Sequence, residues 1–199
     1  MTSATDTMPR EVPGRQVADF LPSAYHGLPL LRLFLPFADS NGDPVRWSAL
    51  GHLDDSARQM SWPEWAERQS VTVAVSTQLE PTGGVLDHAT AEALRDAVGA
   101  MSVEGLRWAG YGALDFPTVR VHAEDYYRSS LDPADLRAGA RVPEFAWDTT
   151  GALAWGARLY PDSLIVAAAQ PLFRQLFSDD RLDTVSVRIG DNVPWSAGD

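Results

Sequence analysis

Apolar residues along this chain mostly follow the two-residue period of β-strands, with a few stretches of helical period between them. The dense apolar run at 30–37 ends at the turn-forming sequence DSNGDP, which predicts a buried strand with a hairpin-like exit. Alternating valines at 70–77 and alternating apolar residues at 184–189 predict two further strands. The remaining predicted strands lie at 106–114, 118–127, 144–149, 153–160 and 163–168.

Helices are predicted where capping signals precede a helical apolar pattern. Ser61 with Glu64 has the capping-box spacing and begins a helix that runs to about residue 69. Asp87 caps a helix through Val98, which Gly99 ends. A short capped helix is predicted within 132–139, and a last one starts at 171 with its inward residues Leu172, Phe173, Leu176 and Phe177.

These elements predict an α+β fold with seven or eight strands and three or four short helices. Many neighbouring strands are joined by turns too short for a parallel crossover, so the sheet should be mainly antiparallel. Residues 20–190 form one globular domain in this prediction, with a flexible tail at 1–19 and a loose tail at 191–199. Val193 and Trp195 are the two residues of the second tail that have the apolar character to fold back onto the domain.

The composition excludes several mechanisms. All 16 basic residues are arginine, and the chain has neither lysine nor cysteine. Schiff-base chemistry, thiol nucleophiles, disulfides and thiolate metal sites are therefore excluded. Isoleucine and asparagine are also scarce, which favours codon bias in a GC-rich genome, and selection against lysine is the alternative.

The charge limits the partners. A formal charge of −11 argues against binding to nucleic acid or to an anionic membrane, since both need a basic surface. A basic protein surface, a neutral small molecule and a metal cation remain compatible with it. The polar residues 1–19 show no secretory signal, and with no cysteine in the chain the cytoplasm is the expected location.

Two histidine–carboxylate pairs are the candidates for chemistry. His52 with Asp54 and His122 with Glu124 each place two ligands on one face of an extended segment. If the two pairs converged, they would suit a divalent metal or general acid–base catalysis. The alternative is an ordinary solvated strand face, and no cofactor is predicted.

A second candidate surface contains tryptophan. Trp62 and Trp65 are three residues apart and share one face of the predicted helix, so Trp62 is a candidate exposed anchor for a protein partner. The alternative is that both rings pack inward. The acidic residues expected to surround the anchor are Asp54, Asp55, Glu64 and Glu67.

A third possibility is a small-molecule pocket with aromatic walls. Glu144, Asp148 and Tyr160 lie near Trp147 and Trp155 in the sequence, where an ionisable group could face an apolar cavity. The alternative is that these aromatic residues belong to the core.

The sequence contains neither the Gly-x-Ser-x-Gly nor the Gly-x-Gly-x-x-Gly pattern. Without a catalytic signature, the leading hypothesis is a non-catalytic acidic domain that binds another protein as a neutralising, chaperone-like or scaffold partner. A small enzyme that acts on a small molecule through the two histidine–carboxylate pairs is the alternative.

Overall fold

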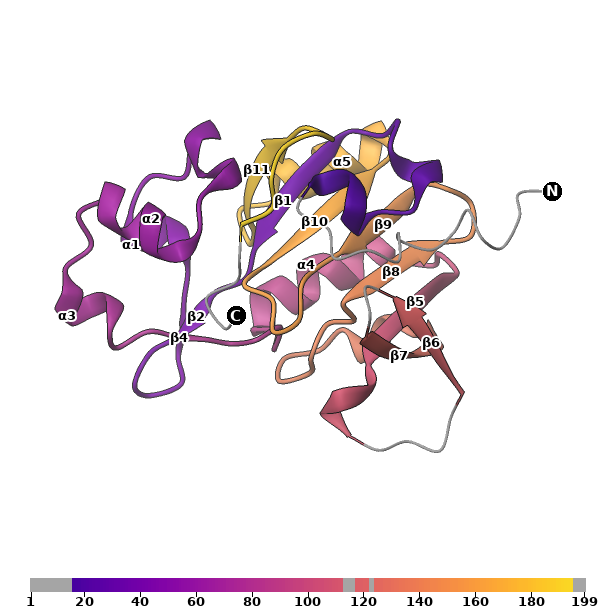
Figure 1. The fold of residues 1–199 in the computed structure, drawn as a ribbon, viewed down its shortest axis with the longest axis horizontal. Helices are drawn as coiled ribbons and strands as arrows, with labels where there is room; N and C mark the ends of the chain where they lie inside the picture. The colour runs from indigo at the N-terminus through magenta and orange to yellow at the C-terminus, as the bar shows by residue number, and fades with distance from the viewer. Residues whose placement is uncertain (1–15, 113–116, 122–123, 195–199) are drawn as a thin grey trace.

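The computed structural model describes residues 16–112, 117–121 and 124–194 and has an α+β architecture, as the sequence predicts. An eight-stranded antiparallel sheet has the order β11-β1-β10-β9-β8-β5-β7-β6, and a small three-stranded sheet has the order β3-β2-β4 (Figure 1). The large sheet consists of β11 (Asp183–Val187), β1 (Leu30–Phe34), β10 (Ser163–Ala168), β9 (Leu153–Gly156), β8 (Phe145–Asp148), β5 (Val103–Trp108), β7 (Glu124–Leu131) and β6 (Thr118–Val121). The small sheet consists of β3 (Pro44–Val45), β2 (Phe37–Ala38) and β4 (Glu80–Pro81).

The helices are short, and most lie between strands. The α-helices are α1 (Trp47–Leu50), α2 (Trp62–Arg68), α3 (Val73–Ser76), α4 (His88–Val98) and α5 (Gln170–Ser178). Single 3-10 turns are η2 (Val17–Phe20), η3 (Ser23–Tyr25), η4 (Asp55–Gln59), η5 (Ala109–Tyr111) and η6 (Pro133–Asp135).

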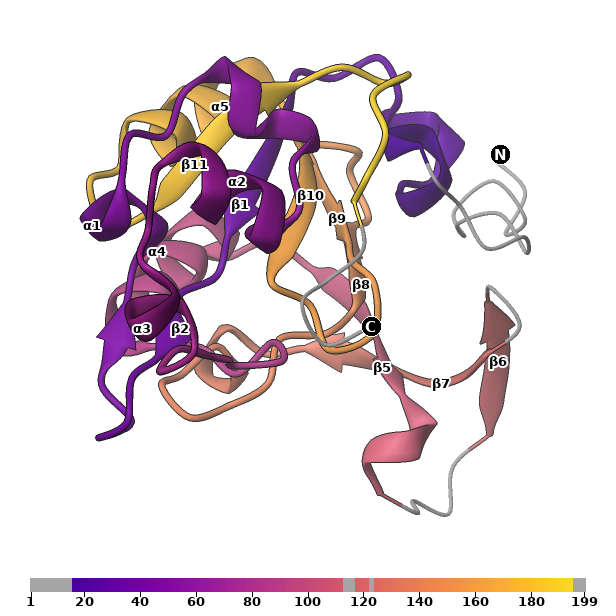
Figure 2. The same ribbon diagram turned by 60° about the vertical axis from the view of Figure 1, so that its left-hand side comes forward.

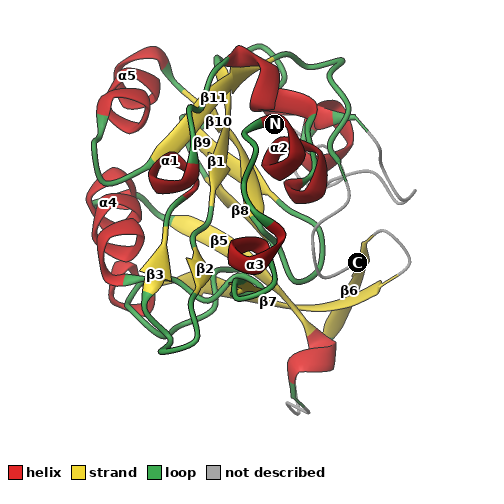
Figure 3. Cartoon of the chain, turned by 90° about the vertical axis from the view of Figure 1, so that its left-hand side faces the viewer, coloured by secondary structure: helices red, strands yellow, loops and turns green. Residues whose placement is uncertain are grey.

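Helices cover both faces of the large sheet. Alternation along β1 sends Leu31 and Leu33 into a core cluster that includes α4 and α5 residues. Leu30 and Phe34 point to the opposite face, into a cluster that includes residues of η2, η3, η4 and α2. Figure 3 shows α4 and α5 on one side of the large sheet and α2 on the other, and Figure 2 shows the same ribbon from an intermediate direction.

The predicted caps are confirmed. Glu64 of α2 accepts a hydrogen bond from the Ser61 backbone N–H at 2.8 Å, as a capping box requires. The side chain of Asp87 accepts from the Thr90 backbone N–H at 3.2 Å. Gly99 ends α4 with φ 51°, a conformation that a residue with a Cβ adopts only with strain.

The strand predicted at 70–77 is wrong. This segment forms the short helix α3, and Val73 is 77% exposed. The hydroxyl of Thr72 accepts from the Val75 backbone N–H, so a local cap competes with the extended conformation that the alternating valines favour. Other predicted strands are shorter than expected: β5 ends at Trp108, where η5 begins, and β9 ends at Gly156. The segment predicted as one strand at 118–127 contains parts of two strands, β6 and β7, which pair antiparallel.

The domain is longer than predicted at both ends. Val17 is 1% exposed, and Gln16 forms an isolated bridge with Asn192. Val193 is 9% exposed, and its carbonyl oxygen accepts from Arg158 at 3.1 Å. Residues 16–19 and 191–194 therefore belong to the folded body, whereas 1–15 and 195–199, including Trp195, lie outside the described residues.

Among the described residues, no helix combines the length and apolar character that crossing a membrane requires.

Candidate functional site

The tryptophans of α2 belong to the core. Trp62 is 7% exposed and Trp65 is fully buried, so the prediction of Trp62 as an exposed anchor is wrong. Their rings pack with Trp47 and Phe37, and the Phe37–Trp62 and Trp47–Trp65 centroid distances are 4.3 and 5.3 Å. Since such pairs stabilise a core beyond their buried area, this aromatic cluster holds α1 and α2 on the sheet.

The acidic residues predicted around this anchor mostly have local partners. Asp54 accepts from the backbone N–H and the hydroxyl of Ser56, and these hydrogen bonds lower the pKa of its carboxyl group. Asp55 pairs with Arg58 at 2.6 Å. Glu64 caps α2, and Glu67 is exposed on the same helix. This surface is acidic but has no aromatic anchor.

The two histidine–carboxylate pairs are not brought together as far as the structure describes them. His52 and Asp54 precede η4, which packs against β11 at one end of the large sheet. Glu124 begins β7, near the other end, and five strands lie between β11 and β7. Adjacent strands are about 4.8 Å apart, so His52 and Glu124 cannot share one metal ion. His122 lies outside the described residues, and within 16–112, 117–121 and 124–194 no group of three potential metal ligands occurs.

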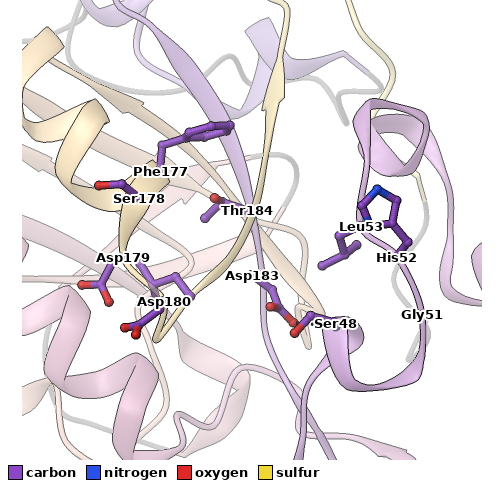
Figure 4. Close-up of a pocket in the computed structure, with 11 residues that line it drawn as sticks. Ser48, Gly51, His52, Leu53, Phe177, Ser178, Asp179, Asp180, Asp183 and Thr184 are labelled. Atoms are coloured by element: carbon purple, nitrogen blue, oxygen red, sulfur yellow. Dashed lines mark hydrogen bonds between the residues drawn. The ribbon is translucent and has the colours of Figure 1, made fainter.

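His52 instead borders a cleft of about 370 Å³ (Figure 4). One wall is formed by α1 and the α1–η4 connection, with Ser48, Gly51, His52 and Leu53. The other is formed by the end of α5, the α5–β11 connection and the start of β11, within residues 177–184. These two walls are more than 120 residues apart in the sequence, so only the fold brings them together.

The cleft carries three carboxylates in different environments. Asp183 is 7% exposed and accepts from the Ser48 backbone N–H at 3.0 Å. Asp179 pairs with Arg181 at 2.7 Å, and hydrogen bonds from Arg181 lower the pKa of its carboxyl group. Asp180 is exposed, and its backbone carbonyl, rather than its carboxylate, accepts from Arg46. Asp180 therefore carries the negative charge that the cleft offers to solvent, and Asp183 adds a nearly buried carboxylate in its wall; neither carboxylate has an ion pair within the described residues.

Phe177 adds an apolar surface at the rim. It was predicted to point inward from α5, but it is 47% exposed and stacks on Phe173 with ring centroids 5.5 Å apart. Sequence reasoning missed this wall of the cleft, although the acidic run at 179–183 between α5 and β11 was a usable signal.

A second cluster of functional groups surrounds Glu144, at the start of β8. Its side chain is fully buried and accepts hydrogen bonds from the Tyr111 hydroxyl at 2.6 Å and the Trp108 backbone N–H at 2.9 Å. Burial raises the pKa of Glu144, and these hydrogen bonds oppose the rise only in part. The Trp108 indole donates to Glu124 at 2.9 Å, which brings that predicted residue to the edge of this cluster.

Aromatic rings and an arginine complete the cluster. The rings of Trp108, Tyr111 and Tyr160 meet edge to face, with centroid distances of 5.2 to 5.7 Å. The guanidinium of Arg141 lies 4.2 Å from the Tyr111 ring centroid. Tyr160 has φ 48°, a strained conformation for a residue with a bulky side chain.

The predicted pocket around Glu144, Asp148 and Tyr160 is therefore brought together only in part. Asp148 has a structural role, since its carboxylate accepts from the backbone N–H groups of Thr150, Ala152 and Leu153 in the β8–β9 turn. Trp147 and Trp155 are 3% and 1% exposed and belong to the core.

Comparison with protein-family models, curated proteins and solved structures finds no match to this chain. Any functional inference therefore rests on the chemistry of the two clusters. The cleft offers negative charge beside an exposed aromatic ring, and the second cluster offers a buried carboxyl group of raised pKa.

Proposed function

We propose that this protein is a non-catalytic binding domain that holds a basic segment of another protein in the cleft between the α1–η4 and α5–β11 connections. The observation that carries this proposal is the composition of the cleft, with Asp180 and Asp183 beside the exposed ring of Phe177. A lysine or arginine side chain combines an apolar stem with a cationic end and fits such a surface. Such a contact is compatible with a neutralising, chaperone-like or scaffold role.

The charge of the whole chain supports the same partner. A net charge of −11 attracts a basic segment from beyond contact distance, although salt screens this attraction over about 8 Å at physiological ionic strength. A nucleic acid or an anionic membrane would be repelled. For such a domain we propose the cytoplasm, since the chain needs no oxidising compartment.

The test is selection from a randomised 12-residue peptide display library, followed by kinetic binding of the enriched peptides. We expect enrichment of arginine and lysine, and an association rate that falls as salt rises from about 50 to 500 mM. Asp180→Asn should weaken binding. Asp125→Asn makes the same charge change at an exposed site on β7 and should leave it unaltered. Enrichment without basic residues, or equal effects of the two variants, would refute the proposal.

General acid–base catalysis at Glu144 is a second candidate function. It is favoured by one observation, a fully buried carboxyl group of raised pKa hydrogen-bonded to Tyr111. Turnover of a small molecule that is lost in both Glu144→Gln and Tyr111→Phe, with the fold retained, would support it. The described geometry gives no support to a small enzyme that uses the histidine–carboxylate pairs His52/Asp54 and His122/Glu124.

A further inference from the structure

The acidic cleft lies at an open edge of the large sheet. β11 is the last strand in the sheet order and pairs only with β1, from Phe34↔Asp183 to Leu30↔Val187. In an antiparallel pair, alternate residues direct their N–H and C=O groups away from the neighbouring strand. Among the described residues, no backbone hydrogen bond joins Asp183–Val187 to any segment other than β1. η4 packs against β11 without such a hydrogen bond, so the outward groups of this strand form a template for one more strand.

The cleft lies at the start of this edge, where Asp183 and Thr184, the first two residues of β11, line it. Consecutive residues of a strand point to opposite faces, yet Asp183 and Thr184 both line the cleft. Figure 4 shows Phe177 and Ser178 on one side of β11, and Ser48, His52 and Leu53 on the other. Walls from both faces border a single cleft here because the cleft opens around the start of the strand.

We infer that the basic segment binds as an extended strand that pairs with the free edge of β11. This inference rests on the proposed function and adds the mode of binding to it. Main-chain hydrogen bonds to β11 supply affinity, and the two walls read the alternating side chains of the added strand. Side chains on the side of Asp183 meet a carboxylate, and those on the opposite side meet the ring of Phe177. The preferred segment therefore alternates basic and apolar residues.

Charge argues against the other obvious occupant, the β11 edge of a second copy of this chain. Two such edges would bring together two chains that each carry a net charge of −11, and their long-range repulsion disfavours a dimer. Like charges at the end of a strand are a common means of preventing edge-to-edge association. The same charges attract a basic strand.

The test is an N-methyl scan of the tightest basic peptide from the display selection, with binding measured against the full chain. N-methylation removes one main-chain donor and blocks pairing on one edge of the peptide. We expect a loss of about tenfold or more at every second position and little change between them, since one main-chain hydrogen bond contributes about 1 kcal/mol and the methyl group adds a clash. Hydrogen exchange should also slow at alternate amides of Asp183–Val187.

The outcomes separate this inference from the function on which it rests. If N-methylation is tolerated throughout, while Asp180→Asn still weakens binding and Asp125→Asn does not, the cleft binds basic side chains and strand addition is refuted. If no basic peptide is selected, both proposals fail, and the acids at this edge serve only to prevent association. A dimer in sedimentation whose formation protects the β11 amides would overturn the basic segment as occupant.

Discussion

Replacement of Arg32 tests whether a buried ion pair fastens η4 to the sheet. Arg32 lies in β1, is fully buried, and donates to the Ser163 hydroxyl at 2.9 Å. It also donates to the backbone carbonyls of Ala57 at 3.2 Å and Met60 at 2.7 Å, and lies 3.6 Å from the carboxylate of Asp162. Burial lowers the pKa of Arg32, and Asp162 opposes that shift. One guanidinium thus connects the sheet, the β9–β10 connection and the segment around η4.

Arg32→Met should lower the free energy of unfolding by about 3–5 kcal/mol, the range for breaking a buried ion pair from one side. The variant removes the Arg32 guanidinium from beside the Asp162 carboxylate, which is 4% exposed. It also leaves the carbonyls of Ala57 and Met60 without these donors, and each unsatisfied group costs about 1–3 kcal/mol. Domains of this size are stable by about 5–15 kcal/mol, so the loss is large but measurable.

Urea denaturation of the wild type, Arg32→Met, Asp162→Asn and the double variant measures this effect. Asp162→Asn removes the buried charge that Arg32 faces, so the double variant should be more stable than the sum of the single losses predicts, by about 0.5–3 kcal/mol. Arg188→Met is a matched control at an exposed site and should stay within about 0.5 kcal/mol of the wild type. A loss below about 1 kcal/mol for Arg32→Met, or strict additivity in the double variant, would refute the reasoning.

Three further predictions concern stability. Ser61→Ala should cost about 0.5–2 kcal/mol in urea denaturation because it removes a capping residue of α2, and unchanged stability would contradict the cap. Gly156→Ala should cost about 1–3 kcal/mol or more because the added Cβ overlaps the Phe20 carbonyl oxygen; a variant as stable as wild type would mean that η2 moves freely. The raised pKa of Glu144 makes the native state bind more protons than the unfolded chain between the ordinary carboxyl pKa and the raised value. The contribution of Glu144 to the free energy of unfolding therefore falls as pH rises through that window. In Glu144→Gln this free energy should depend less on pH. A pH profile identical to that of the wild type would exclude the Glu144 carboxyl group as the source of the dependence.

Features encoded within a few residues could be predicted from the sequence. The apolar run at 30–37 is buried and leaves through a hairpin, β2–β3, as its turn residues predict, but it is divided between β1 in the large sheet and β2 in the small sheet. The helices after Ser61 and Asp87 begin as predicted because a cap satisfies backbone donors within three residues. The α+β class followed from the same local signals and from the short connections between strands.

Errors arose where two local signals competed or where the tertiary neighbour decided the outcome. In 70–77 the period of the valines favoured a strand, but Thr72 offered a helical cap and the segment does not pair with the sheet. For Trp62 the spacing showed which residues share a helix face, but not whether that face meets the core. The exposure of Phe177 depends in the same way on what lies beside α5.

Neither candidate site could be assembled from the sequence. The cleft is formed by two segments distant in the sequence, 48–53 and 177–184. In the second cluster, Tyr111 contacts both Glu144 and Tyr160, which are likewise distant from it in the sequence. Glu144 was recognisable as an ionisable residue near aromatic residues, but its burial, which raises its pKa, depends on contacts distant in the sequence.

Asp180 and Asp183 should act on different kinetic steps when the proposed basic segment binds to the cleft. Asp180 is exposed, and Arg46 contacts its backbone rather than its carboxylate, so it contributes mainly to the long-range field and to the association rate. Asp183 is 7% exposed and fixed by Ser48, so a cation that reaches it is largely desolvated, and loss of that contact raises the dissociation rate. Asp179 adds little to either step, because Arg181 already pairs with it. For the proposed basic segment we therefore expect the affinity to depend on how its cations are placed along β11, and not on the net charge of −11 alone.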